Sequence, residues 1–209
     1  MERYYQIAKA NLKFNLYPHL LISILFLCIS PLLMGVENLD GVRTAQVLEM
    51  YVALVGIILF VPIFYPEQDK DIRDLTEAKF TSATGVYVAR ILEAVICLVL
   101  LVGIYIVWLK YNHCVFPVHE LYLGTIAEAL FLGGMGVVAY SISDQIAIAY
   151  MLPMVYYMMA ISGGSKYLKS FYLFSMMRGS YEEKVYLAVT GVVFLLFGIG
   201  IRYCCRRFK

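Results

Sequence analysis

Residues 47–65 read VLEMYVALVGIILFVPIFY, and residues 66–84, which follow at once, read PEQDKDIRDLTEAKFTSAT. The first stretch is almost wholly apolar, and its length is close to the about 20 residues that a helix needs to cross about 30 Å of hydrocarbon. The second stretch is strongly charged. An apolar stretch of this length beside a charged loop predicts a membrane helix that ends in water.

Similar apolar stretches recur along the chain and predict six spans, at residues 19–36, 46–65, 86–109, 121–142, 145–162 and 184–203. Hydrophobic residues make up 62% of the chain and charged residues 15%, against about 25% charged in soluble domains. Because hydrocarbon cannot satisfy free backbone groups, these spans are expected to be α-helices. The sequence therefore predicts an all-α polytopic membrane protein, with residues 1–209 as a single transmembrane domain that has no soluble catalytic part.

Residues 1–18 differ from the spans that follow. Apolar residues recur there at helical spacing, at Tyr4, Ile7, Ala8, Leu12 and Leu16, beside the basic residues Arg3, Lys9 and Lys13. This pattern predicts a helix lying at the membrane surface, which Pro18 would end before the first span.

Basic residues predict the orientation. An even number of spans puts both chain ends on one side, and that side, with the charged loop and Arg90, carries eleven of the seventeen Lys and Arg residues. The positive-inside rule therefore places both termini and the loop in the cytoplasm, in a multi-pass protein of the cell membrane. The net charge of +2 is too small to suggest nucleic acid as a partner.

Two segments outside the spans are candidates for function. Residues 162–183, on the outer face, contain the aromatic residues Tyr167, Phe171, Tyr172 and Phe174. Aromatics at headgroup level favour a short helix lying in, or dipping into, the outer leaflet; a plain interfacial anchor without a role in transport is the alternative. In the charged loop, Ile72, Leu75 and Ala78 recur every three residues, which predicts a short amphipathic helix that docks a cytoplasmic protein. A solvated connector is the alternative there.

The charged loop resembles that of ABC-2 type transporter permeases. Glu67 comes first, Ile72, Asp74, Leu75 and Thr76 follow, then Thr81, Ser82 and Thr84, and finally Arg90 early in the third span. The six spans, the amino-terminal surface helix and the outer aromatic segment also resemble that family. Two departures are that no Pro follows Ser82 and that Ala89 stands where a Gly often precedes the basic residue.

The resemblance implies a permease subunit of an ATP-driven exporter. Two permease chains, alike or different, would work with two separate ATPase subunits and move a peptide, a lipid-like molecule or another amphipathic substrate. Glu67, Ile72, Asp74, Leu75 and Thr76 would couple the chain to the ATPase. No G-x-x-x-x-G-K-[ST] motif occurs, so ATP and Mg²⁺ are expected on the partner, and no cofactor or metal on this chain.

Ionisable residues inside spans are costly and mark candidate sites. Arg90 and Glu93 lie three residues apart and are expected to pair. Glu128 is either a pathway residue or a hydrogen-bonded carboxyl at a helix contact, and Glu49 is expected to reach the outer interface. Small residues that permit close helix packing surround Glu128 and recur in the last span, at Ala127, Ala129, Gly133, Gly134, Gly136, Gly191, Gly198 and Gly200.

The sequence supports an enzyme less well than a permease. The chain has no H-E-x-x-H motif and no pair of aspartates within two spans, so an intramembrane protease is not indicated. The second hypothesis is an accessory membrane protein, such as an immunity or assembly factor, without transport activity.

Overall fold

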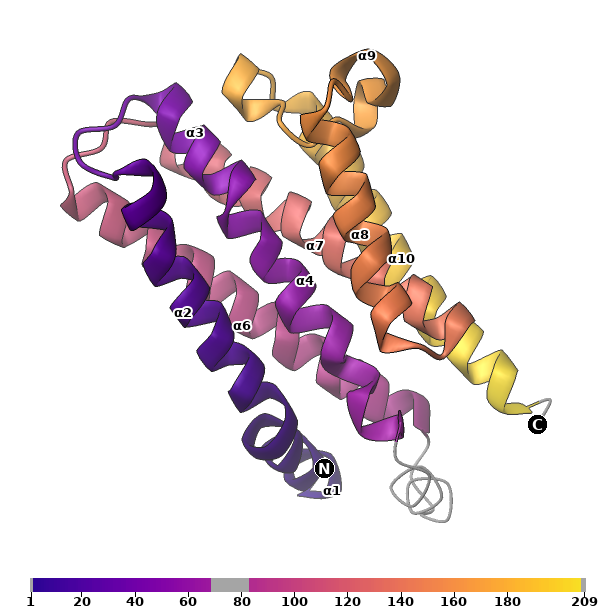
Figure 1. The fold of residues 1–209 in the computed structure, drawn as a ribbon. Helices are drawn as coiled ribbons and strands as arrows, with labels where there is room; N and C mark the ends of the chain where they lie inside the picture. Colours follow the sequence, from indigo (N-terminus) through magenta and orange to yellow (C-terminus); the bar gives the residue numbers. More distant parts are fainter. Residues whose placement is uncertain (1, 69–82, 208–209) are drawn as a thin grey trace.

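The structure, a computed structural model, describes residues 2–68 and 83–207, and these residues form helices and loops with no strand. Figure 1 shows the helices running alongside one another as a bundle. In chain order the elements are α1 (Glu2–Asn11), η1 (Leu12–Leu16), α2 (Tyr17–Met34), α3 (Gly41–Met50), η2 (Val52–Leu54), α4 (Val55–Phe60), η3 (Val61–Gln68), α6 (Ala83–Tyr111), α7 (Val118–Ser143), α8 (Ile146–Ile161), α9 (Ser165–Leu168), η4 (Lys169–Phe171), η5 (Met176–Arg178) and α10 (Glu182–Arg207).

Five helical stretches of the described chain are long and apolar enough to cross a membrane: Ala8–Met34, Gly41–Pro66, Thr84–Tyr111, Val118–Ser143 and Glu182–Cys204. They confirm an all-helical chain, with helices long and apolar enough to cross a membrane at five of the six predicted positions. The remaining position, the fifth predicted span at residues 145–162, holds α8, which has 16 residues. At 1.5 Å per residue α8 is about 24 Å long, shorter than about 30 Å of hydrocarbon, so a span at residues 145–162 remains a prediction.

Both chain ends lie at the same end of the bundle. Figure 1 shows α1 and the last turns of α10 at this end, together with the end of η3 and the start of α6, while α9 lies at the opposite end. This arrangement agrees with an even number of passes; the side of the membrane that each end faces remains a prediction. Of the proposed coupling residues, Glu67 belongs to η3, and Ile72, Asp74, Leu75 and Thr76 lie outside the described residues.

The prediction that Pro18 ends an amino-terminal surface helix is wrong. The helical path continues from α1 through η1, a π-helix, into α2, with Pro18 in the first turn of α2. The N–H of Tyr17 closes the last turn of η1 by donating to the carbonyl of Leu12. Pro18 is the second residue of α2, and the first turn of a helix tolerates a residue without an N–H.

The second span is broken into four pieces, α3, η2, α4 and η3. It begins at Gly41, earlier than the predicted residue 46, because the side chain of Asp40 caps the helix and accepts from the N–H of Arg43 at 2.9 Å. At its other end, Pro62 and Pro66 cannot donate backbone hydrogen bonds, and η3 winds as a tighter 3₁₀-helix.

Small residues bring α4 and α10 against α7. A Cβ on Gly56 of α4 would lie 2.0 Å from the carbonyl oxygen of Ala129, and a Cβ on Gly191 of α10 would lie 2.7 Å from the nitrogen of Phe131. Only glycine permits such backbone contacts. Close packing through the small residues of α7 and α10 is therefore confirmed within the chain, although a Cβ at Gly200 would meet nothing within 4 Å.

Candidate functional site

A buried cluster of three charged side chains joins three of the candidate spans. Glu49 lies in the last turn of α3, Glu128 in α7 and Lys184 in the first turn of α10. The Nζ atom of Lys184 lies 2.7 Å from Glu49 Oε1 and 2.7 Å from Glu128 Oε2. Both carboxylates are fully buried and the lysine is 4% exposed. Because charge inside an apolar bundle is costly and marks function by default, this cluster is the candidate functional site.

The cluster also binds the backbone of residues 162–183, the predicted outer segment. The N–H groups of Met176 and Met177 donate to Glu49 at 2.8 and 3.1 Å, and Lys184 donates a third hydrogen bond to the carbonyl of Leu173. The three donors of the ammonium group therefore all have acceptors. The outer segment is thus anchored in the bundle by buried, charge-assisted hydrogen bonds.

The two acids of the cluster are not equivalent. Glu49 accepts from two backbone N–H groups and from Lys184, whereas Glu128 Oε1 is buried without a hydrogen-bond partner among the described residues. With all three groups ionised, two carboxylates face one ammonium, and the cluster carries a single net negative charge. Glu128 is therefore the acid whose charge is least compensated.

A glycine makes room for this arrangement. A Cβ on Gly124 of α7 would lie 2.3 Å from the sulfur of Met176 and 3.3 Å from Cγ of Lys184. The missing side chain lets the outer segment and the lysine approach α7 together. A side chain at position 124 would therefore displace Met176 and crowd Lys184.

The outer segment consists of three short helices, α9, η4 and η5. Of its four predicted aromatic residues, Phe174 is buried against Tyr157, with ring centroids 5.6 Å apart. Phe171 and Tyr172 lie at the margin of the bundle, and the Phe171 carbonyl accepts from the hydroxyl of Tyr156 at 2.8 Å. Tyr167 is 79% exposed. The segment therefore packs inward at its centre and is exposed at its start.

At the opposite end of the bundle, side chains from three elements hold η3, which immediately precedes residues 69–82. Asn15 of η1 donates to the Pro62 carbonyl at 3.3 Å, Arg90 of α6 to the Ile63 carbonyl at 3.1 Å, and Tyr140 of α7 to the Phe64 carbonyl at 3.3 Å. Pro66 has no N–H to give to the preceding turn, so side chains satisfy carbonyls there instead.

The predicted pair Arg90 and Glu93 forms hydrogen bonds to different elements. Arg90 bonds η3, as described, and Glu93 accepts from the side-chain amide of Asn11 in α1 at 2.7 Å. A further ion pair at this end joins Arg202 of α10 to Asp144, just after α7, at 2.6 Å. The Arg90 and Glu93 contacts therefore tie α6, which follows residues 69–82, to η3, which precedes them, and to α1.

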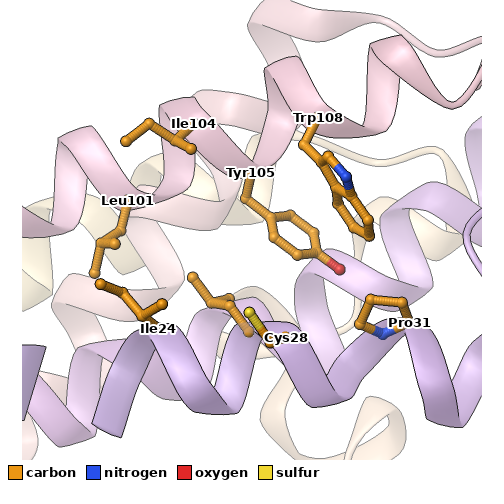
Figure 2. Close-up of a pocket in the computed structure, with 8 residues that line it drawn as sticks. Ile24, Cys28, Pro31, Leu101, Ile104, Tyr105 and Trp108 are labelled. Atoms are coloured by element: carbon orange, nitrogen blue, oxygen red, sulfur yellow. The ribbon is translucent and has the colours of Figure 1, made fainter. Parts of the chain in front are cut away.

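An apolar groove of about 430 Å³ lies between α2 and α6. Figure 2 shows Tyr105 and Trp108 of α6 facing Cys28 and Pro31 of α2 across it. The hydroxyl of Tyr105 is hydrogen-bonded to Ser30 at 2.7 Å, so the groove offers little unsatisfied polarity. The groove suits apolar chains and has no charged side chain in its wall.

Sequence reasoning missed two features of the cluster. The count of basic residues leaves Lys184 among the six that are not on the predicted cytoplasmic side, and Glu49 is expected at the outer interface, yet both side chains are buried. Two acids at similar depth in apolar stretches require a base at that depth, and this signal could have indicated Lys184.

Outside the spans, burial raises the pKa of nearby Tyr181, and Glu120 and Glu49 add to the shift, so its hydroxyl stays neutral at physiological pH.

No group of three His, Cys, Asp or Glu side chains in the described part of the chain could hold a metal ion. No family model matches the chain, and no curated protein and no solved structure matches it. A function must therefore be inferred from the residues and their geometry.

Proposed function

We propose that the chain is the membrane-spanning permease subunit of an ATP-driven exporter of the ABC-2 type. It would cross the cell membrane six times, with both termini in the cytoplasm. It would pair with a second permease chain and draw energy from separate ATPase subunits that bind ATP and Mg²⁺. The substrate would be a peptide, a lipid-like molecule or another amphipathic compound.

The observation that carries the proposal is the way α7 connects the two ends of the bundle. At one end, Tyr140 holds η3 beside the charged loop. Toward the other end, Glu128 holds Lys184, which in turn bonds the Leu173 carbonyl of the outer segment. A shift of η3 would therefore be passed through a continuous helix to the outer segment, as coupling between an ATPase and an outer gate requires.

The charged loop supplies the site for the ATPase in this proposal. The double substitution Ile72→Asp and Leu75→Asp removes two apolar contacts, each worth about 1.5–3 kcal/mol when fully buried. We expect the variant to insert normally but to lose the ATPase subunit when the tagged chain is purified from its native membrane in mild detergent. Asp71→Asn, in the same loop, is the matched control and should retain it.

Two outcomes would contradict the proposal in different ways. Equal ATPase recovery with the double variant would exclude the loop as the docking site. If the wild-type chain recovers no ATPase at all, the chain is an accessory or immunity protein instead.

A further inference from the structure

A polar cavity of about 410 Å³ lies between the outer segment and the first turn of α10. We propose that it binds the headgroup of a phospholipid that ends in a primary ammonium, as in phosphatidylethanolamine. The phosphate would lie at Lys169 and Arg178, and the ammonium at Glu182. The inference depends on α10 spanning the membrane and does not depend on transport activity.

Two cations in the cavity wall are available for an anion. Lys169 belongs to η4 and Arg178 to η5, and neither has an ion-pair partner among the described residues. The guanidinium carbon of Arg178 lies 4.7 Å from the ring centroid of Tyr172, so the ring face orients the group. A guanidinium held flat on a ring still presents its N–H edge, which matches two phosphate oxygens.

A buried hydroxyl in the same wall lacks a partner. Ser175 is 2% exposed, and its Oγ has no hydrogen-bond partner within the described residues. Buried polar groups are nearly always satisfied, so an orphan hydroxyl on a residue of the cavity wall is a candidate hydrogen-bond donor to a ligand. Rotation of the Ser175 side chain toward the cavity would present this hydroxyl to a phosphate oxygen between the two cations.

The acids of the cavity have separate roles. Ser180 donates its hydroxyl to the carboxylate of Glu183, three residues later, in the first turn of α10. Glu183 is therefore occupied by Ser180. Glu182 is exposed and has no ion pair in the described part of the chain. Two available cations and one available acid suit a zwitterion better than a simple anion.

The surface below the cavity favours a lipid over a free zwitterion. Tyr186 lines the cavity, and Val189 and Val193 follow it on the same face of α10. These side chains are 55%, 60% and 52% exposed. Because α10 is long and apolar enough to span a membrane, this strip would face acyl chains while the headgroup occupies the cavity. Figure 1 shows the outer segment at the end of the bundle opposite the chain termini, beyond the ends of α8 and α10.

Native mass spectrometry of the detergent-purified chain tests the site. Wild-type protein should retain one phosphatidylethanolamine more tightly than phosphatidylcholine, whose nitrogen has no N–H, or phosphatidylglycerol, which has no cation. Arg178→Gln should weaken binding of all three lipids about tenfold, as the loss of a charge-assisted hydrogen bond predicts. Glu182→Gln should remove the preference for phosphatidylethanolamine and leave phosphatidylglycerol binding unchanged.

Exposed residues of the same charge provide the controls. Lys166→Gln and Glu37→Gln lie outside the cavity and should leave all three affinities unchanged. Equal retention of the three lipids by wild-type protein, or wild-type affinity in Arg178→Gln, would overturn the proposal. Displacement of the lipid by an equal concentration of soluble phosphoethanolamine would overturn the lipid assignment, because it would show that the acyl chains contribute nothing.

Discussion

Replacing Lys184 with methionine removes the cation that holds Glu49 and Glu128 together. Both carboxylates would remain buried in the bundle without a countercharge, and the backbone carbonyl of Leu173 would lose its donor. Breaking a buried ion pair by removing one partner costs about 3–5 kcal/mol, because the remaining charge is uncompensated. We therefore expect Lys184→Met to destabilise the folded chain by about this amount.

Replacing Glu49 with glutamine should destabilise the chain more than replacing Glu128 does. Glu128→Gln leaves Lys184 paired with Glu49 and should cost about 1 kcal/mol, because one charge-assisted hydrogen bond becomes a neutral one. Glu49→Gln also weakens the bonds from Met176 and Met177, so about 2–3 kcal/mol is expected. Adding Glu128→Gln to Lys184→Met should restore part of the stability, because it removes one uncompensated charge.

The assay is the temperature at which half of the detergent-purified protein is lost from its monodisperse size-exclusion peak. All variants are heated at the same rate, because such loss is irreversible and depends on the rate. Lys166→Met, an exposed lysine of the outer segment, is the control and should match the wild type. The reasoning fails if Lys184→Met melts like the wild type, or if Glu128→Gln costs more than Glu49→Gln.

Three further predictions concern topology, function and packing. In a chain without native cysteines, Asp40→Cys and Lys166→Cys should react with an impermeant thiol reagent on intact cells, and Lys70→Cys only after permeabilisation; external labelling at residue 70 would reverse the orientation. Glu128→Gln should lower substrate-stimulated ATPase activity of the purified complex more than it lowers complex yield, and the opposite pattern would make Glu128 a packing residue only. Gly191→Ala should destabilise the chain by about 1–3 kcal/mol through overpacking, measured by the same size-exclusion assay, whereas Gly200→Ala, with open space at its Cβ, should be neutral or slightly stabilising.

Several structural features were predictable because they depend on local composition. The length of hydrocarbon that a helix must cross is reflected in runs of apolar residues, and five such runs became long helices. Small residues in α7 and α10 indicated close helix contacts, since only a missing side chain allows the backbones of Gly191 and Phe131 to approach. The docking role of the charged loop remains a prediction, because Ile72 and Leu75 lie outside the described residues.

Other features depended on how distant helices meet. Lys184 bonds Glu128, 56 residues away, and Glu49 accepts from the N–H of Met176, 127 residues away. The pattern of apolar stretches cannot predict these contacts, because they depend on which faces of the packed helices meet. The effect of Pro18 likewise depended on the π-turn that precedes it. The sequence by itself determined the apolar helices and the small residues that let them pack; the tertiary structure decided which charges share the interior, because a buried ion is tolerated only where folding supplies its partner.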